Sequence, residues 1–417
     1  MRAHADWLER FRGPVITNPA DTSLAELYSQ DTWPPVFKHM RETAPLNHVS
    51  GTAVGDYWNV CSYAMIQEVE ERSDEFSSSW QYGGIALADP LPGEDFQLPM
   101  FLAMDEPEHG ARRKVIAPAF TPAEINRLAV EIRKRTCEVL DRLPMNHRFN
   151  WVDDVSIELS TQMLAILLDF PWGDRHLLTF WSDWAADMEV SRVPELFQLR
   201  REILGEMATY FLGLWEDKRR SPRSPDLLSM MAHSDAMSEM GQPEFIGNLT
   251  LLIVGGNDTT RNSMSGLVVA LDAFPDERQR LQTNTSLIPN AVNEVIRWHT
   301  PISHMRRTAT VDCELGGQKI AKGDKLALWY ISANRDEAVF ANPDAFDLSR
   351  ENARRHLSFG HGIHRCIGAR LAEIQIRTLI EEMANRRLQA NVVGEIGRTH
   401  ANFVHGFHTV EVELSHY

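Results

Sequence analysis

The stretch FGHGIHRCIG, residues Phe359–Gly368, is the most informative part of this chain. It places Cys366 on a loop that contains the glycines Gly360, Gly362 and Gly368, and an amphipathic helix follows directly. Backbone N–H groups at a helix N-terminus that point at a sulfur lower its pKa, so that a thiolate forms and can bind a metal. Glycine lets the backbone turn tightly and approach a flat ligand closely. The stretch therefore predicts a metal site with one thiolate ligand, against the alternative of a buried cysteine in a glycine-rich turn.

A second motif, Gly255-Gly256-Asn257-Asp258-Thr259-Thr260, lies in the middle of a long apolar segment that predicts a helix. Two adjacent glycines destabilise a helix by roughly 1 kcal/mol each relative to alanine, so something should offset that loss. One interpretation is that side chains here would collide with a ligand and that local opening of the helix makes room for O2 and water. The other is a close contact between two helices through the glycines. Beside the cysteine loop, the first interpretation is favoured.

Together the two motifs resemble those of the cytochrome P450 family. The resemblance implies a fold that is mainly α with a minor β region, a triangular prism of helices around a buried haem. In this family a cysteine thiolate binds the haem iron and favours cleavage of the O–O bond. Cys366 would be that ligand. Asp258 would relay protons from solvent and Thr259 would donate a hydrogen bond during O2 activation, both acting as catalytic residues. The family more often has alanine at the position of Gly255.

The cofactor implied is heme b (iron protoporphyrin IX), whose two propionates need cations or strong hydrogen-bond donors. The resemblance supplies them in three segments: the HxxxR pair His109 and Arg113, then Arg307 in a strand, then His356 ahead of the cysteine loop. Arg112 and Arg306, adjacent in sequence, are weaker candidates. The other residues expected against the cofactor belong to the two motifs above, and they are Gly255, Gly256, Thr259, Phe359, Gly360, His364, Cys366 and Gly368.

A third motif has a structural role. Glu294 and Arg297 are three residues apart on a predicted helix that ends before Pro301, so their side chains can meet. They match the core ion pair of the family, and Arg350 is the expected third member. We expect this cluster to brace the cysteine loop.

Composition limits the other classes of protein. The chain has 417 residues, of which 43% are hydrophobic, and it contains no linker, repeat or charge block, so we expect a single domain over residues 1–417. The net charge of −16 argues against a nucleic-acid binder. The four cysteines are far apart and form no CxxC pair, which argues against a zinc site or a disulfide framework and suits a reducing cytoplasm. The first residues, MRAHADWLERFRG, predict neither a signal peptide nor a membrane anchor.

Periodicity predicts the secondary structure between the motifs. Helices are expected at about 121–143, 155–170, 176–218, 244–274 and 287–299. Strands are expected over 56–63, in an alternating stretch 313–332 with a turn at Gly316-Gly317, and in the tail 399–414. The proline- and glycine-containing stretch 80–103 is expected to be a loop, and 336–355 is expected to be irregular.

Stretches outside the shared motifs resemble the soluble bacterial terminal (ω) hydroxylases of alkanes and fatty acids. They include GGIALADP, FQLPMFLAMDEPEH and TPISHMRRTA. The residues expected to line the substrate site are apolar, as a site for an aliphatic chain should be, with one polar exception, His304. They are Ile85, Leu87, Leu251, Leu252, Val254, Ile302, His304, Met305, Phe403, Val404 and Phe407. Arg192 is a candidate anchor for a substrate carboxylate.

The chain has no room for a reductase domain, so electrons are expected from an external ferredoxin and its reductase. Basic residues near the cysteine and propionate segments would form the docking surface, namely Arg112, Lys114, Arg354, Arg365 and Arg370. A peroxygenase is disfavoured by the Asp258-Thr259 pair. A terpenoid or steroid hydroxylase on the same fold remains an alternative, as does a non-catalytic haem-thiolate sensor, which needs the cysteine loop but not the acid–threonine pair.

Overall fold

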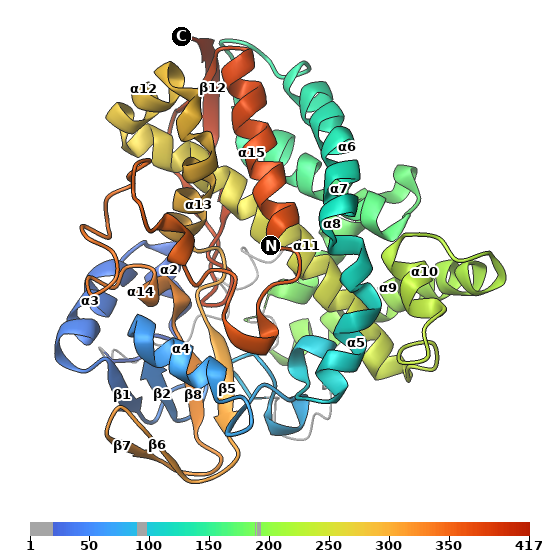
Figure 1. Cartoon of the computed structure of the whole chain (residues 1–417), viewed down its shortest axis with the longest axis vertical. Helices are drawn as coiled ribbons and strands as arrows, with labels where there is room; N and C mark the ends of the chain where they lie inside the picture. Colours follow the sequence, from blue (N-terminus) through green and yellow to red (C-terminus); the bar gives the residue numbers. More distant parts are fainter. Residues whose placement is uncertain (1–19, 90–97, 188, 190–192) are drawn as a thin grey trace.

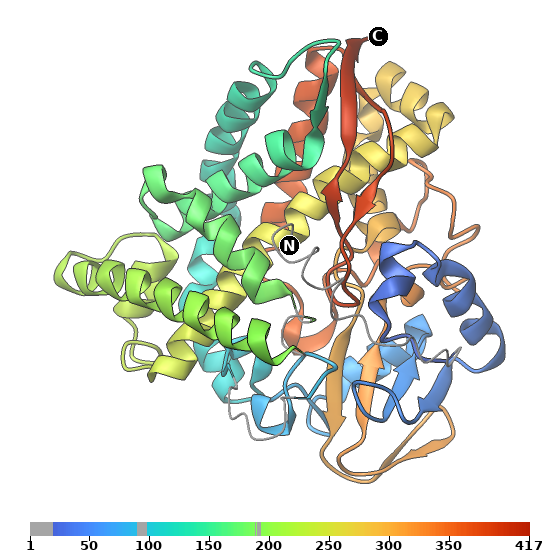
Figure 2. The same ribbon diagram turned by 180° about the vertical axis from the view of Figure 1, so that it is seen from behind.

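One long helix, α11 (Gln242–Ala273), runs through the middle of the molecule (Figures 1 and 2). In this computed structural model, which describes residues 20–89, 98–187, 189 and 193–417, it is in contact with helices from both halves of the chain. Most of its residues from Phe245 to Ala270 are buried. The helix begins with Pro243, which is tolerated in a first turn because its missing N–H would have no partner there.

The other helices surround α11. They are α2 (Ala25–Ser29), α3 (Trp33–Thr43), α4 (Tyr63–Glu71), α5 (Glu108–Ile116), α6 (Pro122–Leu140), α7 (Glu158–Leu168), α8 (His176–Ala186), α9 (Pro194–Arg220), α10 (Leu227–Ala232), α12 (Pro275–Thr283), α13 (Ile288–His299), α14 (Tyr330–Ala333) and α15 (Ala369–Asn385). Short 3-10 turns and a π-helical stretch at Val152–Ile157 join them. Within the described part of the chain, no helix is both long and apolar enough to cross a membrane.

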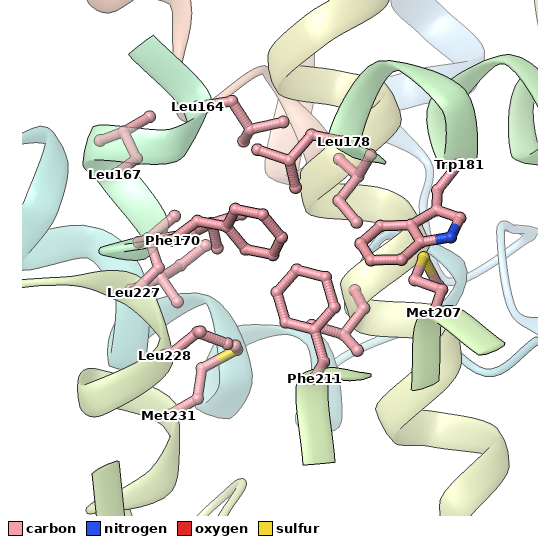
Figure 3. Close-up of a cluster of buried hydrophobic side chains, with 14 of the residues drawn as sticks. Leu164, Leu167, Phe170, Leu178, Trp181, Met207, Phe211, Leu227, Leu228 and Met231 are labelled. Carbon is pink, nitrogen blue, oxygen red and sulfur yellow. The ribbon is translucent and has the colours of Figure 1, made fainter. Parts of the chain in front are cut away.

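The largest hydrophobic core lies between α7, α8, α9, α10 and the first half of α11. Figure 3 shows part of it: Phe170, Trp181 and Phe211 converge with leucines of α7 and α10. The ring centroids of Phe170 and Phe211 are 5.4 Å apart, and those of Trp181 and Phe211 are 5.8 Å apart. Edge-to-face and tilted pairs at these distances are favourable beyond the area they bury, so this core fixes α8 and α9 over α11.

The β region is small: its main sheet lies at the bottom of Figure 1, whereas β12 lies at the top. Its main sheet has the order β1-β2-β8-β5-β3, antiparallel except for the β2–β8 pair. The strands are β1 (Leu46–Val49), β2 (Tyr57–Val60), β3 (Phe76–Ser77), β4 (Arg148–Asn150), β5 (Met305–Ala309), β6 (Cys313–Leu315), β7 (Gln318–Ile320), β8 (Lys325–Leu328), β9 (Leu388–Val392), β10 (Gly397–Arg398), β11 (Phe407–Thr409) and β12 (Glu411–His416). The fold is thus mainly α with a minor β region, as expected.

Two predicted elements differ from the structure. The helix expected over 176–218 is two helices: α8 ends at Ala186, where Asp187 is extended, and α9 begins at Pro194, a residue that is favourable at the first helical position. The strand expected to continue to residue 332 ends at Leu328, and Tyr330–Ala333 forms α14. Tertiary contacts decide the second case, since the Tyr330 hydroxyl donates a hydrogen bond to the buried carboxylate of Glu70, 2.6 Å away. Of the expected loop 80–103, residues 90–97 lie outside the described part.

A buried stack of rings joins the end of α13 to the C-terminal strands. The His299 ring lies between His405 and Phe407, with centroid distances of 4.7 and 5.0 Å. Nδ1 of His405 is 2.6 Å from the carbonyl oxygen of His299. Burial lowers the pKa of His405 to about 4, and it lowers the pKa of His299 well below its usual value. Both rings are therefore neutral in the folded protein at neutral pH.

These depressed pKa values predict that the protein loses stability in acid. In unfolded chains histidine titrates near pH ~6.5. Below that pH the unfolded state therefore binds protons that the folded state does not bind. The free energy of unfolding should therefore be highest above pH ~6.5 and fall as the pH approaches about 4. For His405 alone the slope is about 1.4 kcal/mol per pH unit in this window. Urea unfolding of His405→Gln at several pH values should show that slope reduced, and an unchanged slope would contradict the assignment.

Candidate active site

The cysteine loop makes its turn at two glycines. Gly360 and Gly362 have φ of +67° and +62°, which L side chains rarely adopt. A Cβ on Gly362 would also lie 2.4 Å from the carbonyl oxygen of Glu70. The N–H of Cys366 donates to the carbonyl of Phe359 at 2.8 Å and closes the loop. Gly368, which precedes α15, has an ordinary φ of −83°, so this third glycine is not required for a left-handed turn.

The Cys366 side chain is exposed, with surface open for a ligand. The N–H groups of Gly368 and Ala369 donate to the sulfur, and Arg113 and Arg365 act on it with their charges, all of which favour the thiolate. Desolvation of the thiol by the surrounding protein atoms nevertheless outweighs them and raises the pKa of Cys366 above its usual value. The prediction that this pKa is lowered is thus wrong for the protein without a ligand, although the N–H donors and positive charges that would lower it are present.

Histidines and an arginine gather around the loop. Nε2 of His109 on α5 is 3.1 Å from the carbonyl oxygen of Ile363, and Nη2 of Arg113 donates to the carbonyl of Arg365 at 2.5 Å. The rings of His109 and His364 are 4.2 Å apart. The structure therefore brings α5 and the cysteine loop together as the HxxxR match predicts, and in it His109 and Arg113 contact loop carbonyls.

Two buried histidines carry nitrogens without partners. Nδ1 of His364 and Nδ1 of His356 have no hydrogen-bond partner among the described residues. Burial lowers the pKa of His364 to about 2 and that of His356 to about 3, so both are neutral. A buried polar atom without a partner is unfavourable unless a ligand or water satisfies it. The unpaired nitrogens are thus suited to the polar groups of a ligand at this loop.

The two glycines of α11 have different roles. Gly255 is exposed, its neighbours Val254 and Gly256 are partly buried, and a Cβ on Gly255 would meet nothing within 4 Å. A Cβ on Gly256 would lie 3.0 Å from Leu164 of α7. The close helix contact is therefore found at Gly256, whereas Gly255 leaves open space, and its role toward a ligand stays a prediction. Thr259, one turn from Gly255, is partly exposed, and its hydroxyl donates to the Gly255 carbonyl at 3.0 Å.

Asp258 lies on the other side of α11 and is fully buried. One of its carboxylate oxygens accepts a hydrogen bond from Ser182 at 2.9 Å and pairs with Arg261 at 3.0 Å. Arg261 also pairs with Asp183 of α8 at 2.8 Å, and the Asp183 side chain is 24% exposed. Burial raises the pKa of Asp258, while Arg261 opposes that rise. A chain of ion pairs thus joins the buried acid to the surface.

The Glu294–Arg297 pair is buried and braces the loop indirectly. Arg297 donates to both carboxylate oxygens of Glu294 at 2.7 and 2.8 Å, and Arg350 donates to one of them at 3.0 Å. A further N–H of Arg297 donates to the carbonyl of Asn334 at 2.8 Å. Asn334 in turn accepts from the N–H of Leu357 at 2.7 Å, directly ahead of the cysteine loop. The structure confirms the contact that the sequence predicts for all three residues.

Sequence analysis missed Glu70 of α4. Its carboxylate accepts hydrogen bonds from Tyr330 at 2.6 Å, from the N–H of His361 at 2.9 Å and from Arg307 at 3.2 Å. Burial raises the pKa of Glu70, and Arg307 opposes the rise. Arg307, expected at a propionate, is thus already paired with an acid beside the cysteine loop. An isolated glutamate on an amphipathic helix gives no sequence signal for this role.

The residues expected at the substrate site separate into two groups. One group forms an apolar cluster around Ala186 of α8, with the segments of Ile302 and Val404 bridged to each other as in a sheet. From the expected set this cluster contains Ile85, Val254, Ile302, Met305, Phe403 and Val404. Leu251 and Leu252 of α11 are partly buried and pack against the largest hydrophobic core instead. Arg192 lies outside the described residues.

Leu87, His304 and Phe407 are packed into the core. Leu87 packs in the cluster that contains Trp329, and Phe407 stacks on His299. The His304 ring is fully buried 4.5 Å from Trp329, with Nδ1 3.2 Å from the carbonyl oxygen of Asn402. Burial lowers its pKa to about 4. Packing partners account for Leu87 and Phe407, whereas Nε2 of His304 has no hydrogen-bond partner among the described residues.

The residues present fit a haem. An accessible thiol, an open glycine on the central helix, and two buried imidazoles with unpaired nitrogens supply an iron ligand, space for a flat ring and donors for its carboxylates. Cys366 would hold the iron, and His356, His364, Arg113 and Arg307 are the groups placed to receive the propionates.

Comparisons with known proteins agree with this geometry. A family model described as Cytochrome P450 matches residues 114–386. A solved structure of cytochrome P450-153 from Novosphingobium aromaticivorans is 56% identical, covers 96% of this chain and 100% of its own, and superposes with a TM-score of 0.92. Linalool 8-monooxygenase of Pseudomonas putida is 35% identical over 96% of this chain and 98% of its own length. A methyl-branched lipid omega-hydroxylase of Mycobacterium tuberculosis is 31% identical over 96% and 97%.

Proposed function

The chain belongs to the cytochrome P450 family and is a monooxygenase, and we propose that it hydroxylates the terminal carbon of a medium-chain alkane or fatty acid. The observation that carries the proposal is the apolar cluster of Ile85, Val254, Ile302, Phe403 and their neighbours. Val254 of this cluster directly precedes Gly255, the open position on α11. An aliphatic chain is the ligand that such a lining favours. The relative named as an omega-hydroxylase supports attack at a chain end.

The proposed cofactor is heme b bound through Cys366, and when bound it supplies O2 activation and oxidation of the C–H bond. The protein contributes protons. Asp258 has a raised pKa and would take up and release the proton, while Arg261, which stays protonated, holds this acid beside Asp183 near the surface. Thr259, on the open face next to Gly255, would donate that proton onward through its hydroxyl. This acid–threonine pair distinguishes a monooxygenase from a haem-thiolate sensor and argues against a peroxygenase.

A terpenoid hydroxylase is the second candidate. It is favoured by the relative named linalool 8-monooxygenase, which is more similar in sequence than the relative named as an omega-hydroxylase. The apolar cluster suits a branched hydrocarbon as well as a linear one. The two candidates differ only in the shape of the substrate.

Substrate titration separates the two candidates. We expect medium-chain alkanes or fatty acids to shift the resting enzyme from low to high spin, because an apolar chain excludes the water that binds the iron. Absorbance spectra recorded against linear alkanes, fatty acids and terpenoids measure the shift. A response to terpenoids alone would overturn the terminal-hydroxylation proposal. Reduction under CO, with the band typical of a thiolate ligand, verifies Cys366 in the same sample.

Thr259→Ala should uncouple the reaction. Loss of the hydroxyl interrupts proton delivery, so NAD(P)H consumption should continue while product falls about tenfold or more, with H2O2 released instead. The assay compares NAD(P)H consumed, product formed and H2O2 released. Thr260→Ala, a change at the adjacent and buried threonine, is the matched control and should stay coupled. Normal coupling in Thr259→Ala would remove this residue from the mechanism.

An external ferredoxin is the proposed electron donor, and the cysteine side of the molecule is its proposed docking surface. Lys114, Arg354, Arg365 and Arg370 are exposed there. Arg112 is not available as expected, since its guanidinium pairs with Glu244 of α11 at 2.5 Å and both side chains are largely buried. The docking surface is therefore formed by four basic side chains and not five.

Docking by these charges should depend on salt. At limiting ferredoxin, we expect turnover to fall several-fold from low to physiological ionic strength, because screening weakens attraction between exposed charges. Arg370→Gln should weaken the salt dependence. Lys319→Gln, an equal charge change on the β6–β7 hairpin, is the control. Turnover indifferent to salt would contradict this surface.

A further inference from the structure

Glu70 is a buried acid whose partners come from three other parts of the fold. It lies on α4, and it receives hydrogen bonds from Tyr330 of α14, Arg307 of β5 and the backbone N–H of His361 in the cysteine loop. Its side chain is 1% exposed. The carbonyl of the same residue lies where a Cβ on Gly362 would have to go, so Glu70 contacts the loop through both its backbone and its side chain.

We propose that Glu70 is a positioning residue that keeps the reduction potential of the haem low, by balancing the charge of Arg307 and fixing the backbone of the cysteine loop. The proposal rests on haem binding at Cys366, and it is independent of which substrate is hydroxylated. It assigns Glu70 an electrostatic effect on the cofactor in addition to its structural contacts.

Three hydrogen-bond donors favour the ionised form of Glu70. The phenol O–H, the guanidinium N–H and the amide N–H all donate to it, and an ionised carboxylate can accept all three. Arg307 is also buried, and it donates a hydrogen bond to the neutral carbonyl of Arg306 at 2.9 Å. Glu70 is therefore the anion that balances Arg307 within the described protein.

Removing that anion makes the buried surroundings of Arg307 more positive by one charge, even where a propionate also pairs with Arg307. Reduction of the iron adds an electron, and an unbalanced positive charge in a medium of low dielectric constant stabilises the reduced form. Arg307 is connected to the loop through Glu70, which accepts from Arg307 at 3.2 Å and from the N–H of His361 in the loop at 2.9 Å. Loss of the Glu70 charge should accordingly raise the reduction potential of the haem. In the wild type, the hydrogen bonds to Glu70 hold its carboxylate in place and partly compensate its negative charge.

The neighbouring residue provides a matched control. Glu71 also contacts the cysteine loop, through an oxygen 2.8 Å from Nε2 of His361, but its side chain is 64% exposed. Glu71→Gln therefore removes one negative charge from the same helix, next to the same loop residue, as Glu70→Gln does. Water screens the exposed site, so only the buried substitution should have a large effect.

The test is a redox titration of haem-loaded wild type, Glu70→Gln and Glu71→Gln. Glutamine keeps an acceptor for Tyr330 and His361 while removing the charge. In a solution poised at the wild-type midpoint, the ratio of reduced to oxidised Glu70→Gln should rise about tenfold, or ~59 mV for one electron. Glu71→Gln should stay near the wild-type ratio. An unchanged ratio in Glu70→Gln, or an equal shift in both variants, would overturn the proposal.

Tyr330→Phe tests the same idea if Glu70→Gln does not load haem. It removes one donor and leaves the carboxylate charge less compensated, so its potential should move in the opposite direction, toward more negative values. A positive shift or none would overturn the proposal. The CO spectrum of each sample reports thiolate ligation separately, and substrate titration of the wild type reports the hydroxylase proposal, so failure of one is distinguishable from failure of the others.

Discussion

The guanidinium of Arg297 is the contact on which the rest of the site depends. Each of its five N–H groups has a partner: the two oxygens of Glu294 and the carbonyls of Asn334, Pro343 and Ala345. These carbonyls belong to the irregular segment between α14 and the cysteine loop, which has little regular structure of its own. Breaking a buried ion pair by removing one partner costs about 3–5 kcal/mol, because the remaining charge stays unpaired in the interior. The ion pair on α13 thus helps to position Cys366, because it holds the segment that leads into the cysteine loop.

Within one turn, helix α11 combines a closely packed face with an open face. It must pack closely against α7, which Gly256 permits, and it must leave open space on its other face, which Gly255 provides. The same turn separates Thr259 on the open face from Asp258 on the packed face. Because side chains one residue apart point in different directions on a helix, a single short motif supplies both the space for a ligand and a buried acid behind it.

The two buried acids of the site, Asp258 and Glu70, are stabilised in the same way. Asp258 and Glu70 are each fully or almost fully buried, and each is paired with an arginine and with a hydroxyl donor. Their surroundings differ in connection to solvent. The pair at Asp258 continues through Arg261 to a partly exposed carboxylate, whereas the pair at Glu70 is enclosed by α4, α14, β5 and the cysteine loop. The first arrangement suits movement of protons, and the second suits a fixed electrostatic environment.

The sequence determined the thiol loop, the glycine motif and the Glu294–Arg297 pair, because each depends on residues close together in the chain whose spacing survives in any context. It also determined most long helices, through their apolar periodicity.

Only the tertiary structure decided the partners of buried groups. Glu70 and Arg307 are far apart in sequence, as are Arg112 and Glu244, and the pKa of Cys366 is governed by burial that no local pattern reports. Likewise, apolar residues such as Leu87 and Phe407 have the composition of a substrate site, but packing against Trp329 and His299 places them in the core. Local spacing sets which groups are available, and long-range packing sets their solvation and their partners.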